Sequence, residues 1–215
     1  MRKIPVLLFF IAFSAPHALA QDAAWEIDSE ASWFRVLAWP DGPLKRFGHH
    51  HTISHHSISG SVEIAADPMD SSFSLEVAVA DLVVDDPAQR ALEGEEFEGE
   101  VPEDDIEGTR GNMLGEDLLH GDAFPMIRIQ SDSIEGSLDD ARIVTTVIVK
   151  DVENTVTFPA SIELTDDAFV ARGEIELLHG AFGLSQFTAM GGALSVRDLL
   201  VFKYEIHGSR VADTE

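Results

Sequence analysis

Five of the nine histidines of the chain fall within residues 49–56, which we call the histidine cluster. Imidazole is the side chain that most often binds transition metals near neutral pH. In an extended segment the side chains alternate between two faces, so His49, His51 and His55 would share one face, opposite His50 and His56. Three imidazoles on one face predict a site for a divalent metal such as zinc, copper or nickel.

Two other interpretations of the histidine cluster stay open. Closeness in the sequence does not make imidazoles converge, so these side chains can equally be solvated or hydrogen-bonded within a loop. Some of them can also line the mouth of a barrel and bond the polar head of a ligand. The isolated histidines His120, His179 and His207 lie near the ends of predicted elements, where we expect surface positions.

The sequence lacks the motifs of common catalytic sites. It contains no Gly-x-Ser-x-Gly, no His-Glu-x-x-His and no phosphate-binding loop. It has no cysteine, which excludes thiol catalysis, thiolate metal sites and haem attachment through cysteine. The many carboxylates cannot be sorted into a catalytic pair without geometry. The sequence therefore predicts a protein that is not an enzyme and requires no cofactor.

The first residues have the pattern of a secretory signal peptide. Arg2 and Lys3 precede an apolar run at residues 4–13, and Ala18-Leu19-Ala20 offers a cleavage site before Gln21. The apolar run is too short to span a membrane, and no later run is long enough, so no transmembrane anchor is expected. We predict a signal peptide at residues 1–20 and a mature chain in the periplasm of a bacterium.

The chain is strongly acidic, with 14 Lys and Arg against 39 Asp and Glu and a net charge of −25. Removing the signal, which holds two basic residues and no acids, would take this charge to −27. Such a charge repels nucleic acids and anionic lipid surfaces but tolerates cations. Residues 21–215 suit a single domain, free of nucleic acid partners. A homodimer is left open.

Short segments of alternating apolar and polar residues dominate the chain and predict an antiparallel sandwich or barrel. Tight turns separate them, and no strand–helix–strand rhythm is present. The eight predicted strands are residues 32–39, 57–65, 72–79, 126–130, 141–150, 153–165, 169–178 and 199–207.

Two segments break this all-β pattern. Residues 85–107 hold 11 acids and one base, and we predict a mobile acidic loop there, apart from a short helix that Asp86-Pro87 could cap. Further on, Leu114 and Leu118 are four residues apart and predict a short helix that ends before Phe124-Pro125. That helix is either a lid for a barrel or an ordinary connector.

Several short motifs, taken in order, resemble one family. Trp-Glu-Ile-Asp at residues 25–28, with Ser32 shortly after, resembles the opening of the YceI-like proteins, and residues 58–62 resemble their next strand. Residues 110–125 are similar to the central segment of the family, and Arg110, Leu114 and Pro125 match it.

The resemblance continues to the second half of the chain and covers nearly all of the mature protein. Residues 127–131 resemble a family strand that ends in Ser, and residues 181–184 resemble its Phe-Gly turn. Gly111 and Met113 stand where the family has Asp and His, and an acidic insertion precedes Arg110. These departures indicate a divergent branch.

The resemblance implies an eight-stranded antiparallel lipocalin-like barrel with one or two short helices. It also implies a non-enzymatic periplasmic binding or carrier protein for an isoprenoid lipid or isoprenoid quinone held inside the barrel. The expected lining residues are Phe34, Val36, Ile58, Val62, Phe73, Leu75, Val77, Leu114, Leu118, Ile127, Ile129, Val156, Phe158, Ile162, Ile175, Phe182, Phe202 and Tyr204. The alternative is a periplasmic metal-binding protein that uses His49, His51 and His55.

Overall fold

The computed structural model describes residues 24–211, so the predicted signal peptide lies outside the described residues. The strands are β1 Ala24–Ile27, β2 Trp33–Ala38, β3 Pro40–Asp41, β4 His51–His55, β5 Ser59–Glu63, β6 Ser72–Ala78, β7 Val83–Val84, β8 Met126–Ser137, β9 Asp140–Val149, β10 Val152–Leu164, β11 Ala168–Leu178, β12 Thr188–Ala189, β13 Leu194–Val196 and β14 Leu199–Arg210. The α-helices are α1 Pro87–Arg90 and α2 Glu103–Leu114. Short 3-10 helices occupy Lys45–Phe47, Pro68–Asp70, Val79–Asp81, Glu95–Phe97, His179–Phe182 and Met190–Gly192.

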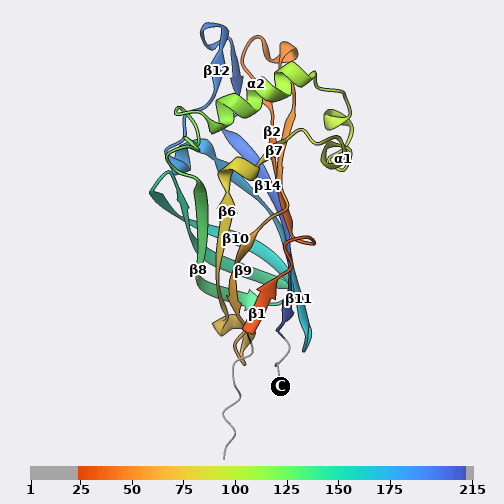
Figure 1. Cartoon of the computed structure of the whole chain (residues 1–215), viewed down its shortest axis with the longest axis vertical. Coiled ribbons are helices and arrows are strands. Elements are labelled where there is room, and N and C mark those ends of the chain that lie inside the picture. Colours follow the sequence, from red (N-terminus) through yellow and green to blue (C-terminus); the bar gives the residue numbers. More distant parts are fainter. Residues whose placement is uncertain (1–23, 212–215) are drawn as a thin grey trace, which may run out of the picture.

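Eight antiparallel strands form a closed barrel, which confirms the predicted fold class (Figure 1). The strands pair in the order β1, β5, β6, β8, β9, β10, β11 and β14, and β14 pairs back with β1. Long hairpins build most of the wall, because the alternating segments of β8 to β11 follow one another with tight turns. Strand β8 runs to Ser137, well beyond the predicted end at residue 130.

The strand that closes the barrel is β1, which was not among the eight predicted strands, whereas the predicted strand at residues 32–39 contributes β2 outside the closed ring. Both β1 and β2 pair with β14, β1 near its end and β2 near its middle, so they lie one after the other along the same neighbour. A turn separates them, because the Asp28 carboxylate accepts the backbone N–H groups of Glu30 and Ala31. At this break the buried Ser32 hydroxyl accepts the backbone N–H of His207 at 2.9 Å.

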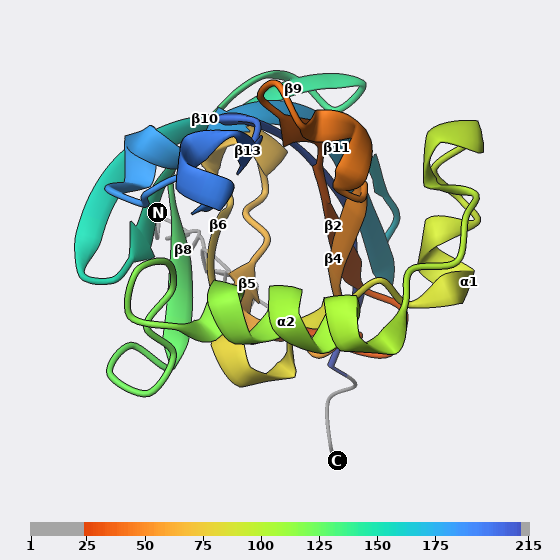
Figure 2. The same cartoon turned by 90° about the horizontal axis from the view of Figure 1, so that it is seen from above.

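The wall extends upward beyond the closed ring on one side. Strand β2 pairs with β4, and β4 pairs with β7. A small sheet of β12, β13 and β3 lies at this same end, and α2 runs along the side of the opening (Figures 1 and 2). His49, His50 and His51 therefore lie at the upper end of the barrel, where β4 begins, whereas His55 and His56 lie at the other end of this strand.

The predictions for the two non-β segments need correction. The short helix at Asp86-Pro87 is present as α1, and the Asp86 side chain caps it. The next helix, α2, begins inside the predicted acidic loop and ends at Leu114, so Leu118 lies beyond it. Three acids in its first turn favour this start because they face the positive end of the helix dipole. Among residues 24–211, no helix is long and apolar enough to cross a membrane.

The acidic segment is also attached to the barrel wall rather than loose. The Glu93 side chain is only 1% exposed and pairs with Arg35 at 2.8 Å and with Lys203 at 2.6 Å. The indole N–H of Trp39 donates a hydrogen bond to the carboxylate of Glu96 at 2.9 Å. The excess of acids predicted a solvated loop, but strands β2 and β14 supply the cations that hold it in place.

Candidate functional site

The lower half of the barrel contains an apolar cavity of about 120 Å³. Its walls come from every strand of the closed ring, and aliphatic and aromatic side chains dominate them. The Tyr204 hydroxyl donates a hydrogen bond to the Pro159 carbonyl at 2.7 Å. Burial raises the pKa of Tyr204, so this phenol stays neutral and the wall carries no charge there.

The upper half contains a second, larger cavity of about 290 Å³. Strands β2, β8, β9, β11 and β14 supply apolar walls, and β4, α2 and the small sheet complete them. This volume is close to the lower limit of about 300 Å³ for small-molecule pockets. Polar side chains gather on the part of the wall made by α2 and the start of β4, and they include His49, His51, Thr109 and Asn112.

A layer of apolar side chains separates the two cavities and belongs to the walls of both. Its members are Phe34, Val77, Ile129, Phe158 and Phe202. Phe202 stacks on Phe34 with ring centroids 5.1 Å apart and meets Phe158 edge to face at 5.8 Å. We call these five residues the septum. Because these five side chains line both cavities, the two cavities are direct neighbours inside the barrel.

Fifteen of the eighteen predicted lining residues lie on the walls of these cavities. The three exceptions are Leu114, Val156 and Ile175, which pack in or against the hydrophobic core without lining either cavity. Leu114 ends α2 and faces the Gly121 turn, since the helix begins and ends earlier than the sequence suggested. The fifteen that line the cavities are Phe34, Val36, Ile58, Val62, Phe73, Leu75, Val77, Leu118, Ile127, Ile129, Phe158, Ile162, Phe182, Phe202 and Tyr204.

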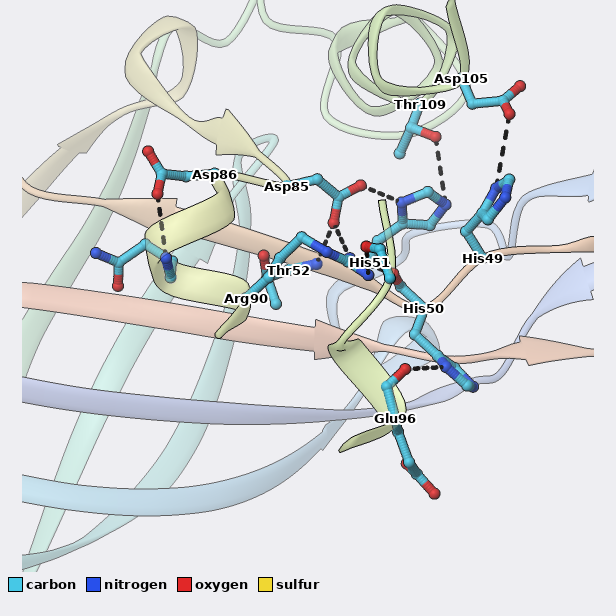
Figure 3. A network of polar contacts seen from close by, with 12 residues as sticks. His49, His50, His51, Thr52, Asp85, Asp86, Arg90, Glu96, Asp105 and Thr109 are labelled. Atoms are coloured by element: carbon cyan, nitrogen blue, oxygen red, sulfur yellow. Dashed lines mark hydrogen bonds and ion pairs between the residues drawn. The ribbon is translucent and has the colours of Figure 1, made fainter. Parts of the chain in front are cut away.

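A buried carboxylate fixes the polar part of the upper wall (Figure 3). Asp85 is 2% exposed and has a positive φ of 54°, a conformation in which Asp is tolerated. One carboxylate oxygen accepts the Thr52 N–H at 2.9 Å and the Arg90 guanidinium at 2.6 Å, and the other lies 2.6 Å from His51 Nδ1. The opposite ring nitrogen of His51, Nε2, lies 3.4 Å from the Thr109 hydroxyl.

The charge state of Asp85 follows from these contacts. Burial by itself would raise its pKa, but the hydrogen bonds from His51, the Thr52 N–H and Arg90 outweigh burial and lower it. Asp85 is therefore an ionised carboxylate with both oxygens occupied. It orients the His51 ring towards α2, as Figure 3 shows.

The three histidines predicted to bind a metal have separate environments. His49 and His51 both lie on the upper cavity wall, with ring centroids 6.1 Å apart, and His49 Nδ1 lies 3.7 Å from the Asp105 carboxylate. His55 is fully buried and stacks on Phe34 at 5.5 Å. Burial lowers the pKa of His55, which keeps its imidazole neutral.

These positions do not bring three ligands together. Within residues 24–211, no group of three or more His, Asp or Glu side chains is arranged to hold a metal ion. Zinc sites use three or four protein ligands. The metal prediction therefore receives no support from the arrangement of the histidine cluster.

Sequence reasoning missed part of the upper wall. His179, expected at the surface, is 7% exposed, lines the upper cavity and lies 3.0 Å from the Asp198 carbonyl through Nδ1. Thr109 and Asn112 were not among the predicted site residues, because the helix that carries them begins within the segment that was predicted to be an acidic loop. The apolar residues of that helix are Ile106, Met113 and Leu114, and of these Met113 is buried.

Comparisons with known proteins agree with this architecture. The chain is similar to the solved structure of BcnA from Burkholderia cenocepacia, with a TM-score of 0.61 and 13% identity over 85% of this chain and 99% of that one. A YCEI protein from Campylobacter jejuni gives a TM-score of 0.52 and 8% identity over 72% of this chain and 82% of that one. At such identities the likeness shows the fold alone, and no curated protein matches the chain.

The family itself comes from a direct match of the sequence. The model of the YceI-like domain matches residues 25–207, which run from the closing strand β1 to near the end of β14. The match covers nearly the whole barrel and every residue that lines the two cavities. The chain therefore belongs to the YceI-like family.

Proposed function

We propose that this protein is a non-enzymatic binding or carrier protein that holds an isoprenoid lipid or isoprenoid quinone inside its barrel. The observation that carries the proposal is the pair of apolar cavities that meet at the septum. The two cavities lie on either side of the septum along the barrel, and polar groups gather on the wall of the upper one. A molecule with a long apolar tail and one small polar head matches this distribution.

The expected driving force is the removal of apolar surface from water. Each Å² removed contributes about 25 cal/mol, so an isoprenoid tail that fills both cavities would gain many kcal/mol before ordering costs. The tail would have to pass the septum, and the aromatic rings there would lie against it. A water-soluble ligand with many polar groups would find few partners on these walls.

Binding of a tailed quinone to delipidated protein tests the proposal. We expect a ubiquinone with an isoprenoid tail to raise the melting temperature in a concentration-dependent manner. At a free ligand concentration of a hundred times Kd, the free energy of unfolding should rise by about 2.7 kcal/mol. The same quinone ring without its tail should give little change. Equal effects of the two compounds, or no effect of either, would contradict a tail-binding barrel.

Export to the periplasm is part of the proposal and rests on the signal-like residues 1–20. We expect the mature chain to begin at or near Gln21. Intact-mass measurement of protein from the periplasmic fraction checks this, and a chain that retains residues 1–20 there would refute cleavage.

A further inference from the structure

We propose that the upper cavity recognises the head of its ligand through an uncharged hydroxyl group, which donates a hydrogen bond to His51 Nε2. The inference rests on the proposed function, because it supposes an apolar tail in the barrel below. It narrows that function to a class of ligand, an isoprenoid alcohol or the hydroquinone form of an isoprenoid quinone. It also predicts that isoprenoid phosphates are poor ligands.

The contact with Asp85 fixes which nitrogen of His51 carries the proton. The Asp85 carboxylate is ionised and can only accept hydrogen bonds, so the Nδ1 atom 2.6 Å away must carry the proton. In a neutral imidazole the other nitrogen then has a free lone pair. The His51–Asp85 pair therefore makes Nε2 an acceptor, which needs an O–H or N–H donor as its partner.

The Nε2 atom of His51 has only a weak hydrogen-bond partner among the described residues. Its neighbour is the Thr109 hydroxyl at 3.4 Å, longer than the usual limit of about 3.2 Å for a good hydrogen bond. His51 and Thr109 both line the upper cavity. A ligand hydroxyl that enters between β4 and α2 can reach Nε2 without breaking a strong internal bond. The Asn112 amide lies on the same wall and can donate a hydrogen bond to the hydroxyl oxygen.

The cavities are also a poor environment for an anion. Of the described residues that line either cavity, none is Lys or Arg. The nearby guanidinium of Arg90 is 8% exposed and already bonds Asp85 and the His50 carbonyl. A phosphate would instead face the Asp85 carboxylate behind His51 and the Asp105 carboxylate beside His49. A desolvated anion without a cation is strongly disfavoured.

Three compounds with the same tail test the inference on delipidated full-length mature protein. They are geranylgeraniol, its methyl ether, which has no donor, and its monophosphate, at about pH 8, where a free imidazole is neutral. We expect the alcohol to bind at least tenfold more tightly than the ether or the phosphate, and tenfold corresponds to about 1.4 kcal/mol. Alcohol and ether of equal affinity, or a phosphate that binds most tightly, would overturn the inference.

Two variants test whether the preference for the alcohol over the ether depends on His51 Nε2. His51→Phe keeps an aromatic ring but has no nitrogen, so the alcohol should lose its advantage over the ether. His50→Phe is the matched control, because the His50 ring bonds the Glu96 carbonyl and does not line either cavity. That variant should keep the full preference, and its loss there would overturn the assignment.

A second variant covers the case in which His51→Phe fails to fold. Thr109→Val removes the weak internal partner of Nε2, so the alcohol preference should stay or increase. Its loss in Thr109→Val would assign the contact to Thr109 and refute the role of His51. Failure of all three compounds to bind wild type would refute the proposed function itself, whereas equal binding of all three would refute only the hydroxyl preference.

Discussion

Replacement of Asp85 by Asn should lower the free energy of unfolding by about 3 kcal/mol, because loss of one partner from a buried ion pair leaves the other charge uncompensated. The Asp85 side chain is 0% exposed and the Arg90 side chain 8% exposed, so water cannot replace the lost contact. Asn tolerates the left-handed backbone at this position, which limits the effect to the charge. Urea denaturation at neutral pH measures the difference.

The neighbouring residue provides a matched control. Asp86→Asn makes the same chemical change at the cap of α1, where Asn and Asp are about equally good caps, so little stability should be lost. Equal losses in the two variants would show that the effect of Asp85→Asn comes from net charge and not from the buried pair.

The stability difference between wild type and Asp85→Asn should also depend on pH. Because the folded-state pKa of Asp85 lies below its ordinary value of 3.8, its contribution is fully present above 3.8. The contribution is then lost as the pH falls from 3.8 through the lowered folded pKa. The difference should therefore be constant from neutral pH to about pH 4 and shrink below it. A difference that shrinks already between pH 7 and 5 would contradict an ionised Asp85.

Replacement of Phe158 by Ala should weaken isoprenoid binding at least tenfold, which is about 1.4 kcal/mol. Phe158 belongs to the septum, so its ring would contact a tail from both cavities. A fully packed Phe→Ala change costs about 3–5 kcal/mol of stability. Since part of this ring faces cavities, delipidated Phe158→Ala should lose less stability than that. Binding titrations and thermal denaturation of the same preparation measure both effects.

Val156→Ala is the control for this second change. Val156 lies two residues earlier on β10 and is similarly buried, at 7% exposure against 8% for Phe158, but it lines neither cavity. It should lose about 2 kcal/mol of stability through packing and keep its affinity for the ligand. If Phe158→Ala loses the full core amount while affinity is unchanged, the septum is ordinary core packing.

The barrel could be predicted from the sequence because each wall strand alternates with a period of two. Val156, Phe158 and Ile162 on β10 are an example, since their spacing alone places them on one face. The closing strand β1 could not be assigned in the same way. It has four residues, and its place depends on pairing with β5 and with the end of β14, far away in the sequence.

The sequence singled out His49 and His51, which do line the upper cavity, but it could not pair His51 with Asp85. His51 and Asp85 are 34 residues apart, and no spacing rule joins a histidine cluster to one particular acid in an acidic chain. Local composition also misled the prediction for residues 85–107. Their charge predicted a mobile loop, whereas the cations that bind Glu93 come from β2 and β14. Contacts of this kind depend on the closed barrel.

Mass spectrometry of the organic extract of untagged protein, purified from its own periplasm, tests the central claim most directly. A barrel that carries an isoprenoid should release a single class of isoprenoid lipid or quinone in near-stoichiometric amount, and Phe158→Ala protein should release much less. A folded wild-type protein that releases no lipid, and that binds none of the isoprenoid compounds added to it, would show that the barrel is not a lipid carrier.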